Sequence, residues 1–127
     1  MLLSLSQQSQ ESLHQQLSRQ IRRLILAGDL PPGFGLDSIR ALAKTHRVSA
    51  ITVRRAYDDL EHEGLIYSRP GKGYYVAEVP AHRKSDLIFQ RLSHLLPPIL
   101  GQALEEGLTE DELLAFIKNQ IKTLGGA

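Results

Sequence analysis

The chain has 127 residues, a formal net charge of +1 at pH 7 and no cysteine, and 42% of its residues are hydrophobic. This length suits one compact domain with a small appendage, and the lack of cysteine excludes a disulfide framework or a thiolate metal site. No apolar run approaches the length of a membrane span and no charged-then-apolar leader opens the sequence, so we expect a soluble cytoplasmic protein.

The charge is unevenly distributed along the chain. Residues 11–76 contain ten basic and seven acidic side chains, whereas the residues after 76 contain five basic and seven acidic ones. A basic excess favours contact with phosphate groups. The difference is small, so it supports nucleic-acid binding only in combination with a matching motif.

A helix is expected over residues 10–27, after a lead-in over residues 1–9 that is rich in Ser and Gln and is expected to be frayed or extended. Its apolar residues recur at helical spacing, with Gly28 at the position of a C-terminal cap; they are Leu13, Leu17, Ile21, Leu24 and Ile25. Arg22 and Arg23 are expected on a solvated face. Residues 30–33, Leu-Pro-Pro-Gly, predict a turn because they cannot continue a helix.

Two short helices with a tight turn between them are expected next. Ser38 can cap the first, which ends near Val48, and Ser49 can cap the second, which Gly64 can end. The inward residues of the first are Ile39, Leu42 and Ala43, and those of the second are Val53, Ala56, Tyr57 and Leu60.

A short hairpin follows the third helix. Residues 65–67 and 74–76 are typical of strands, and residues 70–73, Pro-Gly-Lys-Gly, predict the turn between them. Helix, turn, basic helix and basic-tipped hairpin together predict a winged helix-turn-helix, which inserts a helix into the DNA major groove. A plain hairpin with solvated charges is the alternative for the turn.

Candidate DNA contacts come from the second helix, the third helix and the wing. Arginine can pair with guanine through two hydrogen bonds or clamp a phosphate, and free N–H groups at helix starts can bind phosphates. Glycines in the wing let the backbone approach DNA closely. The expected DNA-binding residues are Ser38, Arg40, Ser49, Ala50, Ile51, Thr52, Arg54, Arg55, Arg69, Gly71 and Lys72.

Two tail helices are expected after Pro80. The first begins near Arg83 and must be interrupted or kinked at Pro97-Pro98, because neither proline can donate the intrahelical hydrogen bond. The second begins with a capping box from Thr109 to Glu112.

The apolar stripes of the tail are too few to build a separate core. They predict a dimer interface, since helix-turn-helix regulators gain affinity by dimerising on a two-fold symmetric site. Folding back onto the same subunit is the alternative. The expected interface residues are Leu87, Ile88, Leu92, Leu95, Leu113, Ile117 and Ile121.

Residues 13–76 closely resemble the DNA-binding domain of GntR-family bacterial transcription regulators, over the stretches 13–33 and 38–76. The segment R-A-Y-D-D-L-E-H-E-G-L-I and the short helical tail are similar to the YtrA subfamily, in which the tail is a small dimerisation module. The resemblance implies DNA roles for Arg40, Thr52, Arg54 and Gly71. It also implies an operator over the protein's own operon, often one with transporter genes.

The sequence departs from the family at three positions. Asp37 replaces the usual proline, Ile39 stands where many members have glutamate, and Ala50 stands where many carry an arginine that reads guanine. Base specificity therefore does not transfer from other members.

The predicted fold is mostly α with a small β-hairpin wing: a lead-in over 1–9, a winged helix-turn-helix domain over 10–78, and a helical dimerisation tail over 79–127. The helix-turn-helix spans about 38–57 and the wing about 65–78. The predicted function is a homodimeric, sequence-specific DNA-binding regulator on a palindromic operator, associated with the nucleoid when bound, with repression favoured over activation. A winged helix that binds protein instead of DNA is the alternative.

Neither catalysis nor a cofactor is expected. The five histidines share no helix at three- or four-residue spacing, so they form no metal-ligand pattern. No Ser/His/Asp order, phosphate loop or nucleotide fingerprint is present, and the chain is too short for the catalytic domain of aminotransferase-fused regulators. The expected partners are duplex operator DNA and a second copy of the chain, and a small-molecule effector is left open.

Overall fold

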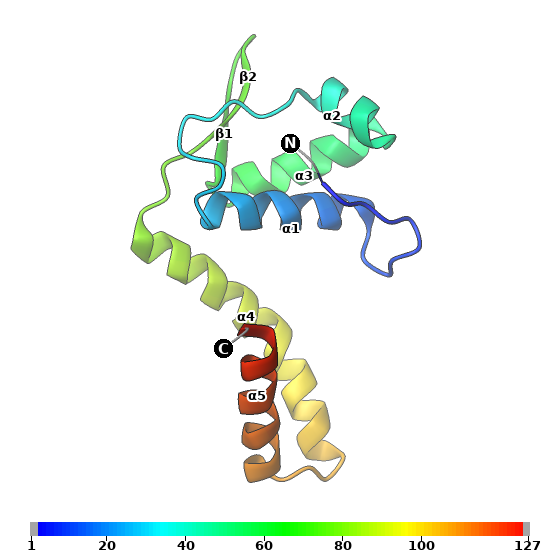
Figure 1. Ribbon diagram of the computed structural model, residues 1–127, viewed down its shortest axis with the longest axis vertical. Helices are drawn as coiled ribbons and strands as arrows, with labels where there is room; N and C mark the ends of the chain where they lie inside the picture. The colour runs from blue at the N-terminus through cyan, green and yellow to red at the C-terminus, as the bar shows by residue number, and fades with distance from the viewer. Residues whose placement is uncertain (1–2, 126–127) are drawn as a thin grey trace. The chain divides into compact units, whose positions relative to one another are not determined.

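The computed structural model of the chain describes residues 3–125 and has five helices and a two-stranded hairpin in that range, in the order α1, α2, α3, β1, β2, α4, α5 (Figure 1). The elements form two compact units, which meet in the chain between Lys84 and Ser85. The predicted fold class, a winged helix-turn-helix followed by a helical tail, is confirmed. Residues 1–2 of the predicted lead-in and 126–127 of the predicted tail lie outside the described residues.

Helix α1 spans Leu13–Leu26, three residues later than the predicted start. The later start has a local cause: Ser12 is the N-cap, and it exchanges hydrogen bonds with Gln15 in a capping box. At the other end Gly28 adopts a φ of 86°, in the region that favours glycine. Side chains therefore satisfy free backbone groups at the start of the helix, and backbone N–H groups of the following turn satisfy them at its end.

Two residues of the lead-in, Ser4 and Ser6, are hydrogen-bonded to α1. The Gln16 side-chain amide donates to the Ser6 carbonyl at 2.8 Å and accepts from the Ser6 N–H at 2.9 Å. Gln20 makes the same pair of bonds with Ser4, at 2.6 and 2.8 Å. Gln16 is buried at 3% exposure, so its amide is a structural group. Of the two predicted alternatives, extended holds and frayed does not for residues 4–6.

Helices α2 (Ile39–His46) and α3 (Ala50–His62) form the helix-turn-helix, as predicted. The Ser38 hydroxyl accepts from the Ala41 N–H at 3.0 Å, and Ser49 caps α3 in the same way. Arg47 closes α2 in the left-handed conformation, with φ 54° and ψ 46°. That single residue reverses the chain direction and sets the tight turn.

The wing consists of β1 (Ile66–Arg69) and β2 (Gly73–Val76), paired antiparallel with Ile66 opposite Val76. Residues 33–36 pair with the other edge of β2. Gly33 donates to the Val76 carbonyl at 2.8 Å, and Val76 donates to the Phe34 carbonyl at 2.9 Å. The wing is thus a hairpin with its second strand bonded on both edges, an arrangement the sequence did not predict.

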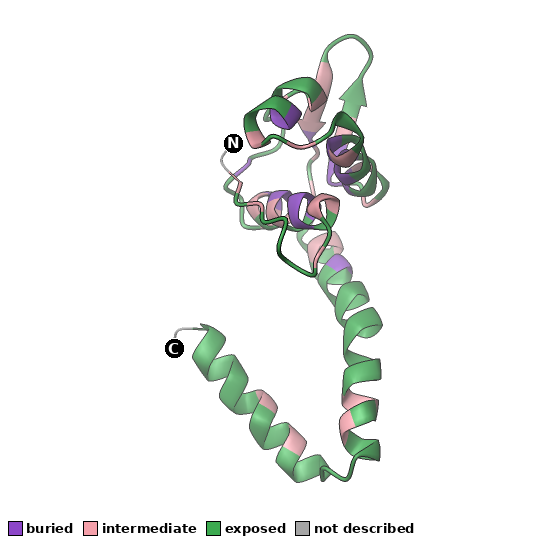
Figure 2. Ribbon diagram, turned by 90° about the vertical axis from the view of Figure 1, so that its right-hand side faces the viewer, coloured by how far each residue is buried: buried purple, intermediate pink, exposed green. Residues whose placement is uncertain are grey.

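The core of the first unit lies where α1 and α2 pack on α3 (Figure 2). Each fully buried apolar side chain contributes about 1.5–3 kcal/mol of transfer free energy. The completely or almost completely buried members are Leu17, Ile21, Leu42, Val53, Ala56, Tyr57, Leu60, Leu65, Ile66 and Val76. The predicted inward residues at the middle of α1 and along α3 are among these buried side chains, so both predictions are confirmed there.

Tyr57 joins the recognition helix to its surroundings. Its ring packs edge-to-face on Tyr74 of β2, with centroids 4.9 Å apart, and its hydroxyl donates to the Asp37 carbonyl at 2.6 Å. Burial raises the pKa of the Tyr57 phenol above its ordinary value, and the charges of Asp37 and Tyr74 act in the same direction. One side chain thus fixes α3 against both the wing and the start of α2.

The tail contains α4 (Ala81–Glu105) and α5 (Glu110–Gly125). Of the two alternatives predicted at Pro97-Pro98, interruption is wrong, because α4 continues through both prolines, and a kink stays a prediction. The proline φ is compatible with a helix, and the carbonyls that lose their donors belong to Ser93 and His94, which are exposed to water.

The capping box at the start of α5 is confirmed. Thr109 accepts from the Glu112 N–H at 3.1 Å, and the Glu112 carboxylate accepts from the Thr109 N–H at 3.1 Å and from its hydroxyl at 2.9 Å. The hydrogen bond from the Thr109 backbone N–H lowers the pKa of the Glu112 carboxyl most, and the bond from the Thr109 hydroxyl lowers it further.

Candidate nucleic-acid interface

The residues predicted to contact DNA come together on one side of the first unit. Both views place α2 and the wing on the side away from α1 (Figures 1 and 2). All of the predicted DNA-binding residues are exposed except Thr52, which is half-buried. Their assignment as DNA contacts stays a prediction.

The first turn of α3 is capped by a pair of hydroxyls. The Ser49 Oγ accepts from the Thr52 N–H at 3.1 Å and lies 2.8 Å from the Thr52 Oγ1. Between these two residues, Ala50 and Ile51 are exposed, and Ile51 retains 66% of its accessible surface. The start of the helix therefore offers an apolar surface beside two mutually bonded hydroxyls.

Arginines follow on the next turn of α3. At about 100° per residue, Arg54 and Arg55 lie on the face opposite the buried stripe, and both are exposed. The charge on the exposed side of α3 then changes from positive to negative, because Asp58 and Asp59 are also exposed. A phosphate-lined groove attracts the arginines and repels the aspartates, so the first two turns of α3 are the part suited to DNA.

The cations of this face are free of acidic partners. Within residues 3–125, the side-chain ion pairs join Arg19 to Glu11 and Arg22 to Glu63, and neither involves Arg40, Arg54 or Lys72. Desolvating an unpaired arginine against a phosphate breaks no internal salt bridge. The positive charge of the face is therefore fully available to an anionic ligand.

Arg22 has a different role. Its Nε donates to Glu63 at 2.8 Å, and a second nitrogen bonds the other carboxylate oxygen. The pair links α1 to the end of α3 in a largely buried position. The prediction that Arg22 contacts no DNA therefore has a structural explanation, although its expected solvated face does not hold.

The wing turn has the geometry expected of Pro-Gly. The Lys72 N–H donates to the Arg69 carbonyl at 2.9 Å, and Gly71 adopts a φ of 73°. A side chain other than glycine would be strained at that φ. Arg69, Gly71 and Lys72 are all exposed at the tip.

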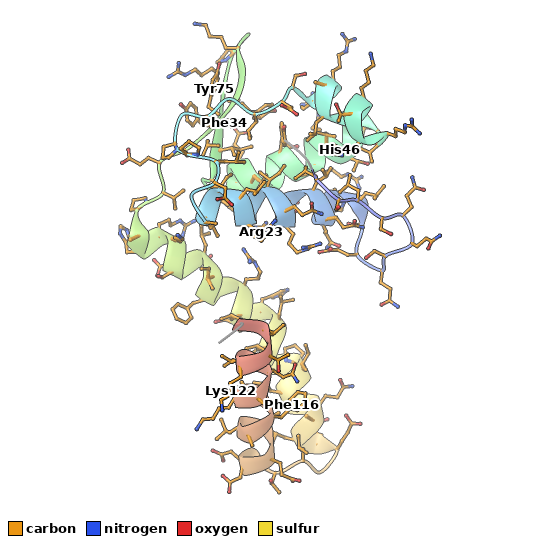
Figure 3. The ribbon with its side chains drawn as sticks, viewed as in Figure 1. Arg23, Phe34, His46, Tyr75, Phe116 and Lys122 are labelled. Carbon is orange, nitrogen blue, oxygen red and sulfur yellow. The ribbon has the colours of Figure 1, made fainter. Side chains whose placement is uncertain are left out.

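Two tyrosines and Arg69 form an aromatic cluster on the wing, which we term the wing stack. Tyr67 and Tyr75 are cross-strand partners whose rings stack 5.8 Å apart, and the Arg69 guanidinium lies 5.8 and 5.4 Å from the two ring centroids. The Tyr75 hydroxyl donates to the Lys72 carbonyl at 3.2 Å. Figure 3 shows Tyr75 next to Phe34, and Phe34 belongs to the segment that pairs with the outer edge of β2.

The wing stack was not predicted from the sequence, although one signal points to it. Tyr67 and Arg69 are two residues apart in a strand and so share a face. That Tyr75 lies on the same face can be predicted only if the register of the two strands is known. The register in turn depends on the turn of three residues between them. Arg69 is thus a positioned cation on a rigid surface and not a loose charge on a loop.

The tail displays an extensive apolar surface, which we term the tail apolar surface. Figure 2 shows α4 and α5 diverging from the loop that joins them, with most of their residues exposed. The large exposed side chains are Ile88, Phe89, Leu92, Leu95, Leu96, Ile99, Leu104, Leu108, Leu114, Phe116, Ile121 and Leu124. The two helices thus leave their apolar faces uncovered within one chain.

The predicted interface residues fall into three groups. Ile88, Leu92, Leu95 and Ile121 are exposed, and Leu113 and Ile117 are half-buried. Leu87 is buried at 6% exposure within the single chain, so it has little surface to offer a partner. Their role in dimerisation stays a prediction.

Other kinds of site have little support within residues 3–125. No group of three or more His, Asp or Glu side chains there could hold a metal ion, and no helix there is long and apolar enough to cross a membrane. A cleft at the end of α1 has mainly apolar walls, including Ile25, Leu30, Val76 and Val79, with the Lys84 side chain at its edge. These walls hold no set of converging polar groups of the kind that binds a cofactor.

The sequence and the fold match known regulators. Residues 13–76 match the profile of "Bacterial regulatory proteins, gntR family". The HTH-type transcriptional repressor YtrA of Bacillus subtilis is 34% identical over 120 residues, which cover 92% of this chain and 90% of that protein.

Two solved structures are similar over most of their length. A GntR family transcriptional regulator from Listeria monocytogenes has a TM-score of 0.70 and 26% identity, over 87% of this chain and 96% of that one. YtrA from Sulfolobus acidocaldarius, a GntR-family transcription factor, has a TM-score of 0.59 and 31% identity, over 74% of this chain and 99% of that one.

Proposed function

Because the chain belongs to the gntR family of bacterial regulatory proteins and resembles its YtrA members, we propose that it is a repressor that binds a palindromic operator as a homodimer. The family makes it a DNA-binding transcription regulator. The observation that carries the proposal is the single exposed face of the first unit, which presents the first turns of α2 and α3 with arginines that have no acidic partner.

In this proposal α3 enters the major groove by its N-terminal half. Arg54 and Arg55 reach base edges or the groove walls, because a guanidinium can pair with guanine O6 and N7. Arg40, Ser38, Ser49 and the free N–H groups at the starts of α2 and α3 hold phosphates, which are favoured at the positive end of a helix. The acidic second half of α3 stays outside the groove.

The wing supplies a second contact. Gly71 lets the backbone of the turn come close to the duplex, and Lys72 and Arg69 bind the adjacent backbone or the minor groove. The wing stack holds the Arg69 guanidinium over two rings, which leaves its N–H edge available to a phosphate oxygen.

We assign dimerisation to the tail, residues 79–127. The tail apolar surface supports this, because soluble monomers rarely expose a large contiguous apolar area. Dimerisation places two recognition helices on two half-sites and doubles the number of bases read. The residues we expect to matter most are the exposed ones on both helices, including Ile99 and Phe116.

Binding to the operator of its own operon, often with transporter genes, and residence in the cytoplasm complete the proposal. The chain acts by binding and has no catalytic role or cofactor, in line with relatives that are transcription regulators. A small-molecule effector is not needed for this mechanism.

Selection of bound sequences from random DNA duplexes tests the proposal. We expect a palindromic consensus, and an affinity that falls steeply as salt rises, because phosphate contacts release counterions. The alternative, a winged helix that binds protein, predicts no enriched sequence and little salt-dependent affinity for duplex DNA. Either of those two results would contradict the proposed function.

A further inference from the structure

The first turn of the recognition helix is apolar at its most exposed point. Ile51 keeps 66% of its accessible surface, and Ala50 beside it is exposed as well. At about 100° per residue, Ile51 lies directly opposite the centre of the stripe formed by Val53, Tyr57 and Leu60. Most of its apolar surface therefore stays in contact with water in the folded chain.

The polar groups of the same turn are already engaged with each other. The Ser49 Oγ accepts the Thr52 N–H and lies at hydrogen-bond distance from the Thr52 Oγ1. Ala50 and Ile51 have no side-chain donor or acceptor. On the most exposed side of this turn, hydrogen-bonded base readout therefore depends on Arg54 and Arg55, about one turn further on.

The floor of the major groove offers one apolar group, the C5-methyl of thymine. We propose that Ile51, with Ala50 beside it, packs against a thymine methyl in each operator half-site. This contact rests on the proposed function and adds the recognition of one base pair to it. Ile51 would recognise an A·T pair through its thymine methyl, next to a base pair that an arginine reads. The small Ala50 side chain lets the helix approach closely enough for Ile51 to touch the methyl.

The expected size of the contact follows from the burial of one methyl group. Transfer of one CH₂-sized group from water is worth about a fourfold change in affinity. A dimer reads two half-sites, so removing both methyls lowers affinity about sixteenfold. Effects of this size are readily measured by fluorescence anisotropy.

The test uses the full chain and the operator obtained by selection. Each thymine is replaced in turn by deoxyuridine, which removes the C5-methyl and leaves every hydrogen-bonding group in place. We expect one symmetry-related position whose replacement weakens binding about fourfold per half-site. Ile51→Ala should abolish that difference between thymine and deoxyuridine, with circular dichroism unchanged because most of the Ile51 side chain is exposed.

Arg55→Ala is the matched control. It lies on the same exposed face and should lower affinity for both duplexes while leaving the thymine-to-deoxyuridine ratio intact. The proposal is overturned if no thymine in the operator is sensitive to the replacement, or if the sensitivity persists in Ile51→Ala. In those cases the selected consensus still supports the proposed function, whereas a selection that enriches no sequence overturns both.

Discussion

The two units of this protein treat their apolar residues in opposite ways. In the first unit, α1, α2, α3 and the wing bury Leu17, Leu60 and the other core residues almost completely. In the tail, α4 and α5 leave large side chains such as Phe116 and Leu124 exposed. One unit covers its apolar side chains within the chain, whereas the other leaves most of them exposed. The difference teaches that apolar residues at helical spacing do not by themselves form a core within one chain.

The largest expected effect separates the two units by stability. Leu60→Ala removes a fully buried side chain from the core and should lower the free energy of unfolding by about 2–5 kcal/mol. Leu124, which is 82% exposed, is the matched leucine in the tail. Leu124→Ala should change that free energy by less than about 0.5 kcal/mol in dilute protein. Urea unfolding measures both, and equal losses would contradict the contrast.

A second prediction concerns the tail apolar surface. Leu92→Asp combined with Ile121→Asp places charges on exposed positions of both helices, so each chain should stay folded but fail to pair. Sedimentation should show a monomer, and operator affinity should fall about 10²-fold or more because two linked half-site contacts become independent. Gln90→Asp, an exposed polar position on α4, controls for added charge. A double variant that remains dimeric would refute the assignment of the tail.

Within the first unit, Tyr57→Phe isolates one buried hydrogen bond. Loss of the hydroxyl leaves the Asp37 carbonyl without its donor at 2.6 Å, and the unfolding free energy should fall by about 1–3 kcal/mol.

The same variant has a pH signature. The pKa of Tyr57 is raised in the fold, so the folded chain keeps a proton that the unfolded chain loses above about pH 10. The stability from this shift is present below that pH and is lost as the pH rises past it. Between pH 8 and pH 10.5, the free energy of unfolding should fall less for Tyr57→Phe than for the original chain. Equal decreases in the two proteins would argue against a buried neutral phenol.

The smallest predicted effect concerns the wing stack. Tyr67→Leu keeps an apolar strand residue but removes one ring beneath Arg69, so operator affinity should fall about two- to fivefold, the size of a cation–π contact of about 0.5–1 kcal/mol. In an Arg69→Ala background the same change should have no effect. A double-mutant cycle measured by anisotropy separates this result from a general weakening of the hairpin, which would persist without Arg69.

Much of the first unit could be predicted because its signals are local. Ser38 and Ser49 cap helices that begin beside them, and Gly71 marks a turn that needs its positive φ. The features that escaped prediction depend on contacts distant in sequence. Gln16 is buried because its amide meets a backbone ten residues away, and the pairing of residues 33–36 with β2 joins two segments about forty residues apart.

The tail shows the opposite limit. Pro97 and Pro98 indicate a break in α4 by their chemistry alone, but solvent around Ser93 and His94 can satisfy the freed carbonyls, and the helix continues. The candidate interface was predicted from periodicity on each helix. Periodicity does not say which side is covered within the chain, so the predicted set includes Leu87, which is buried in the single chain.

The sign change along α3 has a consequence for how the protein meets DNA. Arg54 and Arg55 lie near the helix start, where the backbone dipole is also positive, and Asp58 and Asp59 follow one turn later. The helix therefore carries an electric polarity along its axis. In the proposed complex, the negative field of a duplex favours orientations in which the start of α3 faces the phosphates and its acidic second half faces away.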